Sequence, residues 1–517
     1  MSFPFLSVLI FFPLLGAIVT LLLPKEHVSV IRWTALCIAA VELVYSLVLI
    51  LVYGEVSATT LPCAPGTEAC LNLYISEKVP WITSLGINYS LGLDGISLLL
   101  VVLTTLLTFV CIAASFSQER KVKHYMAFML LLECGMLGVF LSVNLFLFYI
   151  FWELMLIPAY FLVGSWGGAR RIYAAFKFVL YTSVGSLLML AGIIAVGYYH
   201  QLASGGGYTL EWSSLLSTPI DSTVQIWLFL AFAAAFAIKV ALVPLHSWLP
   251  DTYCEAPAPV TVMLAGAMSK TGAYGFLRFC IPLFPQAVHT LAPLFSILAV
   301  ISILYGALMA LVQSDLKRLI AYSSISHLGV IVLGLFALNI QGAEGGVIQM
   351  FNHGITIAAL FLIVGFLEAR VGTRQIREFG GLAARVPVLA TVMLIAVLSS
   401  LGLPGLNSFA GEFLTLLGAF RNNITFGVLG TAVVVPAAWY MLRFFLSVME
   451  GARPSEGAVA ATLRKYPLSD IHLGEFLSLT PLLALIFYLG LQPLPLTFLM
   501  EQSVINTMQT LGSMFVK

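Results

Sequence analysis

The feature that most constrains this chain is a succession of apolar runs, many about 20 residues long, separated by short polar segments. Hydrophobic residues make up 60% of the 517 residues and charged residues only 9%, against about 25% charged in ordinary soluble proteins. A water-soluble fold could not bury so much apolar surface. The composition therefore predicts an integral membrane protein and excludes a soluble enzyme, a disordered protein and a nucleic-acid binder. The formal net charge of +1 gives no bulk attraction to an acidic partner.

The spacing of the apolar runs, with Gly, Pro and charged residues as boundaries, predicts about 14 transmembrane helices. Their centres fall near residues 13, 43, 104, 133, 153, 186, 233, 270, 301, 328, 357, 400, 438 and 485. The first run, from Phe3 to Leu23, has no basic start and no small-residue cleavage site. We therefore expect this run to be a retained helix rather than a signal peptide.

Two of the predicted helices carry a proline in the middle of the run, at Pro244 and Pro404. Proline removes a backbone donor and clashes with the preceding turn, so we expect both helices to break within the membrane. Broken backbone at that depth is tolerated only inside protein or beside water. A pair of broken helices favours a transporter built from repeats, with its ion path at the breaks. An ordinary proline kink is the alternative for either helix taken alone.

Ionisable residues inside the predicted spans are the strongest functional signal, because each costs at least about 2.5–3.5 kcal/mol to insert. The deep ones lie on separate helices: Glu133, Glu153, Lys239, Lys270, His327, His353 and Glu412. For Glu42 and Glu475, a structural role at a helix contact or at the interface is an equal alternative. Buried Lys changes charge when a nearby carboxylate leaves, and His titrates near neutrality. The set therefore predicts a chain of groups that passes protons laterally.

Basic residues predict the orientation of the chain. If the loop at 119–123 is cytoplasmic, alternation through the spans places most Lys and Arg on that side. Both termini and the loop that holds Cys63 and Cys70 then lie outside, where these two cysteines are predicted to form a disulfide. Two free thiols are the alternative. The seven cysteines include no CxxC pair and no spacing typical of an iron–sulfur or haem ligand set.

Five motifs, in this order, resemble those of the antiporter-like membrane subunits of respiratory complex I. They are FWELMLIP at 151–158, KVALVPLHSWLPD at 239–251, AGAMSK at 265–270, DLKRLIAYSSISH at 315–327, and GLPG at 402–405 followed by GEF at 411–413. The resemblance extends from about residue 90 to about residue 450. Chains of the L and N types and several Mrp antiporter subunits typically carry Lys where this chain has Glu412, and the L type has a longer C-terminal part. The chain is therefore similar to the branch that carries Glu.

This resemblance implies an all-α polytopic membrane protein of about 14 transmembrane helices, with two inverted five-helix repeats and two broken helices. The N-terminal three-helix segment with its external loop would occupy residues 1–120. The first and second repeats would occupy residues 121–285 and 286–450. A C-terminal helix and tail would follow at 451–517.

The resemblance also implies a role for each deep charged residue. Glu153 and Lys239 resemble the control ion pair of the family, and Lys270 resembles its central proton carrier. His327 and His353 resemble the connecting histidines. Glu412 resembles the terminal carrier, and Glu133 a secondary carboxylate on the fourth helix.

The implied function is that of a proton-translocating, non-redox subunit of an NADH–quinone oxidoreductase. The sequence has no dinucleotide-binding glycine loop and no P-loop, so we expect the chain to bind no cofactor and no metal. NADH, FMN, iron–sulfur clusters and a quinone would be used in other subunits of the complex. The implied partners are chain-L-like and chain-N-like membrane subunits and the lipid bilayer, without nucleic acid, and the chain would not function alone. The expected location is the bacterial plasma (inner) membrane, which is favoured over a thylakoid membrane.

Three alternatives belong to other classes or complexes. An Mrp-type cation/proton antiporter subunit would share the fold, but Glu412 and the short C-terminal part argue against it. A subunit of a membrane hydrogenase complex stays open. A secondary transporter for an organic solute should carry aromatic or polar substrate groups at its breaks, whereas the first break lies between Lys239 and His246, which suit protons.

Overall fold

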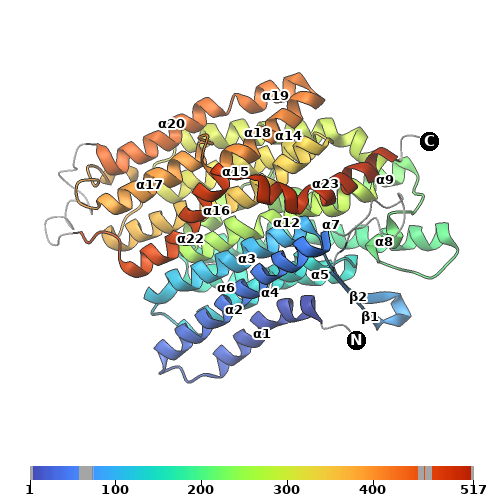
Figure 1. Cartoon of the computed structure of the whole chain (residues 1–517), viewed down its shortest axis with the longest axis horizontal. Helices are drawn as coiled ribbons and strands as arrows, with labels where there is room; N and C mark the ends of the chain where they lie inside the picture. Colours follow the sequence, from blue (N-terminus) through green and yellow to red (C-terminus); the bar gives the residue numbers. More distant parts are fainter. Residues whose placement is uncertain (1–3, 58–72, 74, 452–458, 460–467, 514–517) are drawn as a thin grey trace.

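The computed structural model describes residues 4–57, 73, 75–451, 459 and 468–513. Long helices lie side by side in an elongated bundle, and a two-stranded hairpin projects at one end (Figure 1). The N-terminal part consists of α1 (Phe5–Leu22), α2 (Val28–Ser57), β1 (Ile75–Ile82), β2 (Ile87–Leu93) and α3 (Gly95–Ala114). Two short 3₁₀ helices, Thr83–Leu85 and Ser115–Ser117, flank β2 and α3.

The middle of the chain forms ten helices, several of them short. They are α4 (Val122–Leu141), α5 (Leu145–Leu154), α6 (Leu156–Trp166), α7 (Arg171–Ser204), α8 (Trp212–Leu215), α9 (Ser222–Val240), α10 (Trp248–Glu255), α11 (Ala258–Met263), α12 (Lys270–Gly275) and α13 (Ile281–Leu283). Two π-helical segments, Leu264–Met268 and Phe276–Cys280, join α11 to α12 and α12 to α13.

The last part begins with two long helices that pack tightly against each other. Its helices are α14 (Pro285–Leu311), α15 (Leu316–Leu335), α16 (Ile340–Val371), α17 (Pro387–Ser400), α18 (Asn407–Asn422), α19 (Ile424–Thr431), α20 (Val434–Phe445), α22 (Leu473–Leu491) and α23 (Leu494–Ser513). A 3₁₀ turn, Ile376–Glu378, precedes α17, and a π-helical turn, Leu446–Glu450, continues α20.

The predicted polytopic all-α fold is confirmed. Twelve helices in the described part of the chain are long and apolar enough to cross a membrane. The other two expected spans, near residues 270 and 400, are divided into shorter pieces: the first at its π-helical segments and the second at residues 401–406. The exact count of 14 therefore stays a prediction.

Both predicted helix breaks fall at their prolines. The first broken helix ends at Val240, and Pro244 lies in the linker before α10; the second ends at Ser400, and Pro404 lies in the linker before α18. In the second linker Gly402 has a φ of +68°, and a Cβ there would lie 2.5 Å from Glu412 Oε2. Only glycine adopts that conformation without strain and leaves room for the carboxylate.

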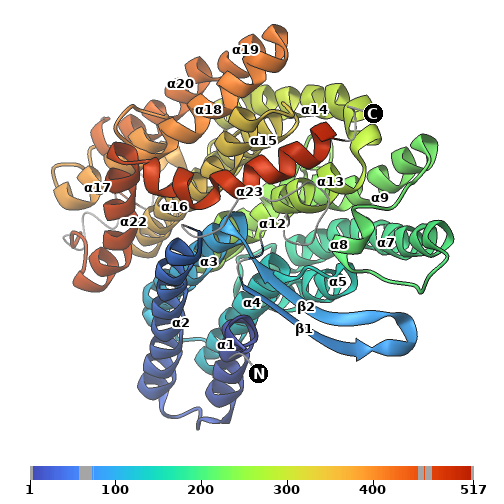
Figure 2. The same ribbon diagram turned by 45° about the vertical axis from the view of Figure 1, so that its right-hand side comes forward.

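Loops that the basic residues assign to one side of the membrane meet at one end of the bundle. The indole nitrogen of Trp166 donates to the carbonyl of Arg120, and Arg370 donates to the carbonyl of Asp470. Both termini and the hairpin are drawn at the opposite end (Figures 1 and 2). This grouping agrees with the predicted alternation, and the assignment of either end to the cytoplasm stays a prediction. Cys63 and Cys70 lie outside the described residues.

Two elements were not predicted from the sequence. The antiparallel hairpin β1–β2 turns at Gly86, whose φ is +60° and where a Cβ would lie 1.8 Å from the carbonyl oxygen of Tyr208. The second element, α23, lies against α3 and α16 and crosses the bundle obliquely (Figure 2). Tyr53 donates to the carbonyl of Leu499, and Ser503 accepts from the amide of Gly95, which fixes α23 across the bundle.

Candidate functional site

Lys270 begins the best connected part of the predicted site. It is fully buried at the start of α12, directly after the π-helical segment Leu264–Met268 and Ser269. Its Nζ donates to the carbonyl of Ala265 and lies 3.3 Å from Ser269 Oγ and 2.8 Å from His353 Nδ1. π-Helical turns are rare and are frequent at functional sites. Here one places a buried amine against a histidine on α16.

From His353 the chain of groups continues across two more helices. The rings of His353 and His327 have centroids 5.3 Å apart and are tilted by 39°. His327 Nδ1 on α15 lies 3.0 Å from Glu412 Oε1 on α18. Gln349 Nε2 donates to the same carboxylate oxygen at 3.0 Å, and His327 Nε2 lies 3.4 Å from Ser400 Oγ. Four residues predicted from the sequence thus lie in one row, from Lys270 to Glu412.

The chemistry of this row suits protons. A histidine can accept a proton at one ring nitrogen and release another from the second nitrogen. The two contacts at its ends, 2.8 Å at Lys270 and 3.0 Å at Glu412, are within the range needed for proton transfer. Sequence reasoning missed Gln349 and Ser400 because a single amide or hydroxyl in a helix carries no signal of its partner.

Glu153 and Lys239, which the resemblance implies to be an ion pair, are not within ion-pair distance in this structure, and their role as a control pair stays a prediction. No ion pair within 4.0 Å joins them, and neither Lys239 Nζ nor Glu153 Oε1 has a hydrogen-bond partner in the described part of the chain. Lys239 Nζ instead lies 5.1 Å from the ring centroid of Trp152 and 5.6 Å from that of Phe178. When charged, the amine is within reach of cation–π attraction to these rings, and its interaction with Glu153 is electrostatic without direct contact.

Glu133 lies away from this row, on α4, and is fully buried with both carboxylate oxygens unpartnered among the described residues. Glu42 on α2 is 1% exposed, and the two carboxyl groups interact electrostatically. Glu42 is therefore buried against the N-terminal helices rather than facing lipid headgroups. Glu475, in contrast, forms an ion pair with Arg370 at the loop end of the bundle, which gives it a structural role.

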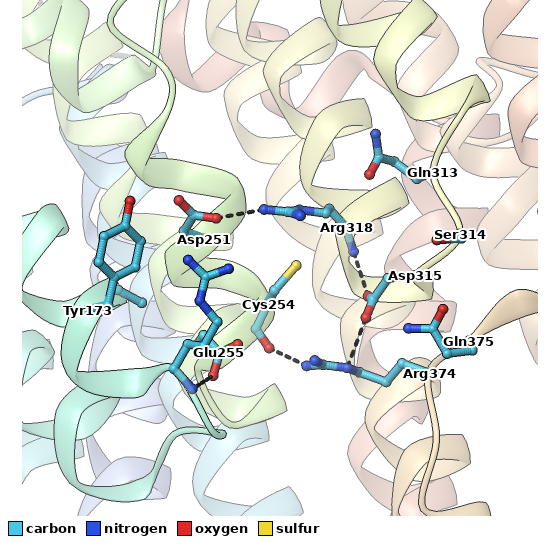
Figure 3. A pocket seen from close by; sticks show the side chains of 12 residues that line it. Tyr173, Asp251, Cys254, Glu255, Gln313, Ser314, Asp315, Arg318, Arg374 and Gln375 are labelled. Carbon is cyan, nitrogen blue, oxygen red and sulfur yellow. Dashed lines mark hydrogen bonds and ion pairs between the residues drawn. The ribbon is translucent and has the colours of Figure 1, made fainter. Parts of the chain in front are cut away.

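A charged cavity of about 210 Å³ lies at the loop end of the bundle, between the two halves of the chain (Figure 3). Asp251 on α10 binds Lys177 Nζ at 2.8 Å and Arg318 Nη2 at 2.6 Å, and thereby joins α7, α10 and α15. On the same wall of the cavity, Arg374 Nε forms an ion pair with Asp315 Oδ2 at 3.2 Å (Figure 3). Burial alone would lower the pKa of Arg374, but the carboxylates of Asp315 and Glu368 raise it above its ordinary value. The cluster is a fixed contact between the halves.

Buried polar atoms without a protein partner occur repeatedly along the predicted proton path. Among the described residues they include Lys239 Nζ, Glu153 Oε1, His353 Nε2, Asn352 Oδ1 and Gln349 Oε1. Such groups in proteins are normally hydrogen-bonded to internal water. The described residues contain no group of three or more His, Cys, Asp or Glu side chains that could hold a metal ion. The site thus offers titratable side chains and places for water.

Comparison with known proteins gives a family match over residues 142–436, to the model described as "NADH:quinone oxidoreductase/Mrp antiporter, TM". The NADH-quinone oxidoreductase subunit M of Rickettsia bellii (strain RML369-C) is 40% identical over 431 residues, which cover 83% of this chain and 85% of that protein. The NADH-ubiquinone oxidoreductase chain 4 of Arabidopsis thaliana is 38% identical over 506 residues, with coverages of 98% and 97%. These names confirm the branch that Glu412 indicated, as distinct from the L and N types.

Solved structures agree with these relatives. A chain of respiratory complex I from Thermus thermophilus with bound NADH has a TM-score of 0.84 and 30% identity, and the match covers 98% of this chain and 99% of that one. A chain of the Mrp complex from Dietzia sp. DQ12-45-1b has a TM-score of 0.81 at 20% identity, with coverages of 98% and 100%. At that identity the second likeness shows a shared fold alone.

Proposed function

The chain belongs to the NADH:quinone oxidoreductase/Mrp antiporter membrane family, and on that premise we propose that its buried Lys, His and Glu side chains carry protons across the membrane in complex I. The enzyme assignment is to the whole complex, since the curated relatives are subunits of NADH-quinone oxidoreductase. This chain takes part as a non-redox translocase subunit.

One observation carries the proposal: the row of contacts from Lys270 through His353 and His327 to Glu412 crosses four helices inside an apolar bundle. Each ionisable group at this depth costs at least about 2.5–3.5 kcal/mol. A structural role would need one pair of groups, and a row of four titratable groups in sequence is what a proton path requires. The two broken helices, which bring Lys239 and Glu412 to linkers inside the membrane, support the same function.

The mechanism follows from these contacts. When Glu153 approaches Lys239, the anion favours the charged amine; when it withdraws, burial disfavours that charge and the proton leaves. Lys239 packs against the helix that Lys270 begins, since a Cβ added at Gly272 would lie 3.0 Å from Lys239 Cβ. The proton that leaves Lys239 would reach Lys270 through internal water. Lys270 then donates a proton to His353 Nδ1. His353 releases one from Nε2, which has no hydrogen-bond partner among the described residues, to an internal water, and that water gives one to His327 Nε2. His327 Nδ1 then donates to Glu412. Each transfer breaks one N–H or O–H bond and forms one N–H or O–H bond.

The remaining assignments follow from the family. Electrons would pass through other subunits, which would use NADH, FMN, iron–sulfur clusters and a quinone, and this chain would bind no cofactor. Its neighbours would be chain-L-like and chain-N-like membrane subunits in the bacterial plasma membrane, with both termini outside. We also propose that the repeats correspond to residues 121–285 and 286–450.

The test interrupts the row without removing either end. His353→Phe in the assembled complex should abolish most proton pumping per NADH oxidised, because Lys270 loses its acceptor. Ser323→Ala is the matched control, since this buried hydroxyl on α15 donates only to the carbonyl of Ile320. Pumping is measured as the change in pH inside sealed vesicles after NADH is added, and the amount of assembled complex is determined on native gels. A His353→Phe complex that assembles and pumps at the control rate would overturn the proposal.

A further inference from the structure

A small cavity of about 20 Å³ lies beside Glu412, at the end of the proposed path. His327 on α15, Ser400 on α17, Glu412 on α18 and Tyr440 on α20 contribute polar groups to its wall. A cavity needs about 10–15 Å³ to hold one water molecule, together with two to four polar partners. Both conditions are met here, so the cavity has the size and lining of a site for a single water.

Tyr440 is the polar residue on this wall whose hydrogen bonding is not accounted for. It is 0% exposed, and its hydroxyl has no hydrogen-bond partner in the described part of the chain. A buried hydroxyl without a hydrogen-bond partner destabilises the folded bundle. The hydroxyl therefore needs a partner, and the cavity it lines is where that partner would lie.

Of the other polar groups around the cavity, only one oxygen of Glu412 is left without a hydrogen-bond partner among the described side chains. His327 uses both ring nitrogens, toward Glu412 and Ser400. Glu412 Oε1 accepts from His327 and from Gln349, which leaves Oε2 without a donor among the described side chains. Glu412 and Tyr440 also interact electrostatically. A water in the cavity could accept from Tyr440 and donate to the carboxylate, and so would complete both groups.

We propose that Tyr440 is a positioning residue that holds one water against Glu412 and thereby sets how readily Glu412 releases its proton. The proposal rests on the proposed function, since it assumes that Glu412 is the terminal carrier. The water stabilises the ionised carboxylate through a charge-assisted hydrogen bond, and Tyr440 fixes the orientation of that water. Loss of the hydroxyl leaves the water free to turn, and the carboxyl then holds its proton more tightly.

The titratable groups around Glu412 determine which proton equilibria the pH dependence of pumping reports. His327 from α15 and Tyr440 from α20 are titratable, whereas α16 presents Gln349 and α17 presents Ser400. Weaker release from Glu412 should therefore appear as a shift of the acid limb of the pumping profile to higher pH. A purely structural role for Tyr440 would change the amount of assembled complex and leave this limb unchanged.

The experiment compares Tyr440→Phe with Tyr125→Phe in the intact complex. Tyr125 is 1% exposed on α4 and bonds Ser115, so its substitution removes a buried hydroxyl far from Glu412. Tyr440→Phe should lower pumping per assembled complex by about tenfold and shift the acid limb to higher pH. Tyr125→Phe should do neither. An unshifted limb and normal pumping in an assembled Tyr440→Phe complex would overturn the inference.

Three further variants distinguish failure of this inference from failure of the proposed function. Ala437→Val adds volume to the cavity wall while it retains the Tyr440 hydroxyl, and it should reproduce the shift if a water is the intermediary. A normal pH profile of pumping in Ala437→Val would show that no water links Tyr440 to Glu412 and would overturn the inference. Adding Tyr440→Phe to Glu412→Gln should cause no further loss, and additive losses would contradict the inference. If Glu412→Gln alone pumps normally, the proposed function fails; if it is severe while Tyr440→Phe is silent, only this inference fails.

Discussion

The two ends of the proposed proton path are built differently. From Lys270 to Glu412 the charged groups lie in contact or ring to ring, with end distances of 2.8 Å and 3.0 Å. At the other end, Glu153 and Lys239 make no ion pair, and the amine lies over the rings of Trp152 and Phe178. The row needs only a bridging water between its two histidines to transfer protons, whereas the separated pair must move before its members can form an ion pair. The difference suggests a path whose control lies at the separated pair.

The largest effect is expected from breaking the separated pair. Lys239→Ala should reduce proton pumping by about a hundredfold or more, because the path loses its first carrier. Glu153→Gln should act similarly, since burial then disfavours the charged amine throughout the cycle. Quinone reductase activity should fall in both variants because pumping and electron transfer are coupled. The measurements are pumping by vesicles and reductase activity, each per assembled complex.

The control for this prediction is Lys239→Arg, which keeps the charge and the cation–π contacts. It should rescue assembly without rescuing pumping, because arginine holds its proton too tightly to serve as a carrier. If Glu153 and Lys239 were only a structural pair, the Ala and Gln variants would lose complex and keep normal activity per complex. Near-normal pumping by an assembled Glu153→Gln complex would defeat the control role.

At the connected end, pumping should depend on whether residue 412 can carry a proton. A substitution that keeps a carboxyl group should therefore cost less than one that removes it. Glu412→Gln should lower pumping by about tenfold or more, because His327 loses its acceptor. Glu412→Asp keeps a carboxyl group and should retain part of the activity. The ratio of the two rates, in complexes of equal subunit content, is the measurement. Equal pumping by the Gln and Asp variants would show that no proton rests on residue 412.

The sequence could predict the features whose physics is local. Pro244 and Pro404 break their helices because a proline acts on its own turn, and both breaks lie where expected. Charged residues in apolar runs stand out one by one, so Lys270, His353, His327 and Glu412 could be chosen before their contacts were known. Their arrangement in one row follows from helix packing, which no single run of sequence encodes.

What could not be predicted depends on how helices sit against each other. Glu153 on α5 and Lys239 on α9 belong to different helices, and their separation is set by tertiary packing that neither run of sequence encodes. The lateral helix α23 follows α22 after a short linker with Pro493, and its lower apolarity made it resemble a tail. The hairpin has few alternating apolar residues in β1, so its strand signal was weak.

A smaller effect is expected at the charged cluster that joins the two halves. Asp251→Asn leaves Lys177 and Arg318 without their shared anion, and these groups are partly exposed. We therefore expect a loss of about 1–2 kcal/mol in stability, seen as a lower midpoint of thermal disassembly of the complex. Pumping per assembled complex should stay within about twofold of normal. A severe pumping defect with unchanged thermal stability would instead make Asp251 part of the proton path.

The smallest effect on pumping should come from substitution of Glu42. This residue belongs to a third kind of region, a pair of buried carboxyl groups, besides the connected row and the separated pair. Glu42 and Glu133 are buried carboxyl groups, and no ion pair involves either of them in the described part of the chain. Two like charges this deep cannot both be ionised at an acceptable cost, so at least one carboxyl group stays protonated. Glu42→Gln replaces this carboxyl group by a neutral isostere and should change pumping by less than about twofold.

Glu133→Gln is the paired measurement, because Glu133 is the member of this pair to which the resemblance gives a role. It should lower pumping by several-fold, as a secondary carboxylate on α4 would, while Glu42→Gln does not. The readouts are pumping per assembled complex and the infrared carbonyl band of protonated carboxylic acids. That band should lose intensity in either variant if both carboxyl groups are protonated, and it should stay unchanged if the pair shares one proton that the remaining carboxyl group keeps. Equal and small effects of both substitutions on pumping would reduce Glu133, like Glu42, to a buried packing residue and confine the path to the residues from Glu153 to Glu412.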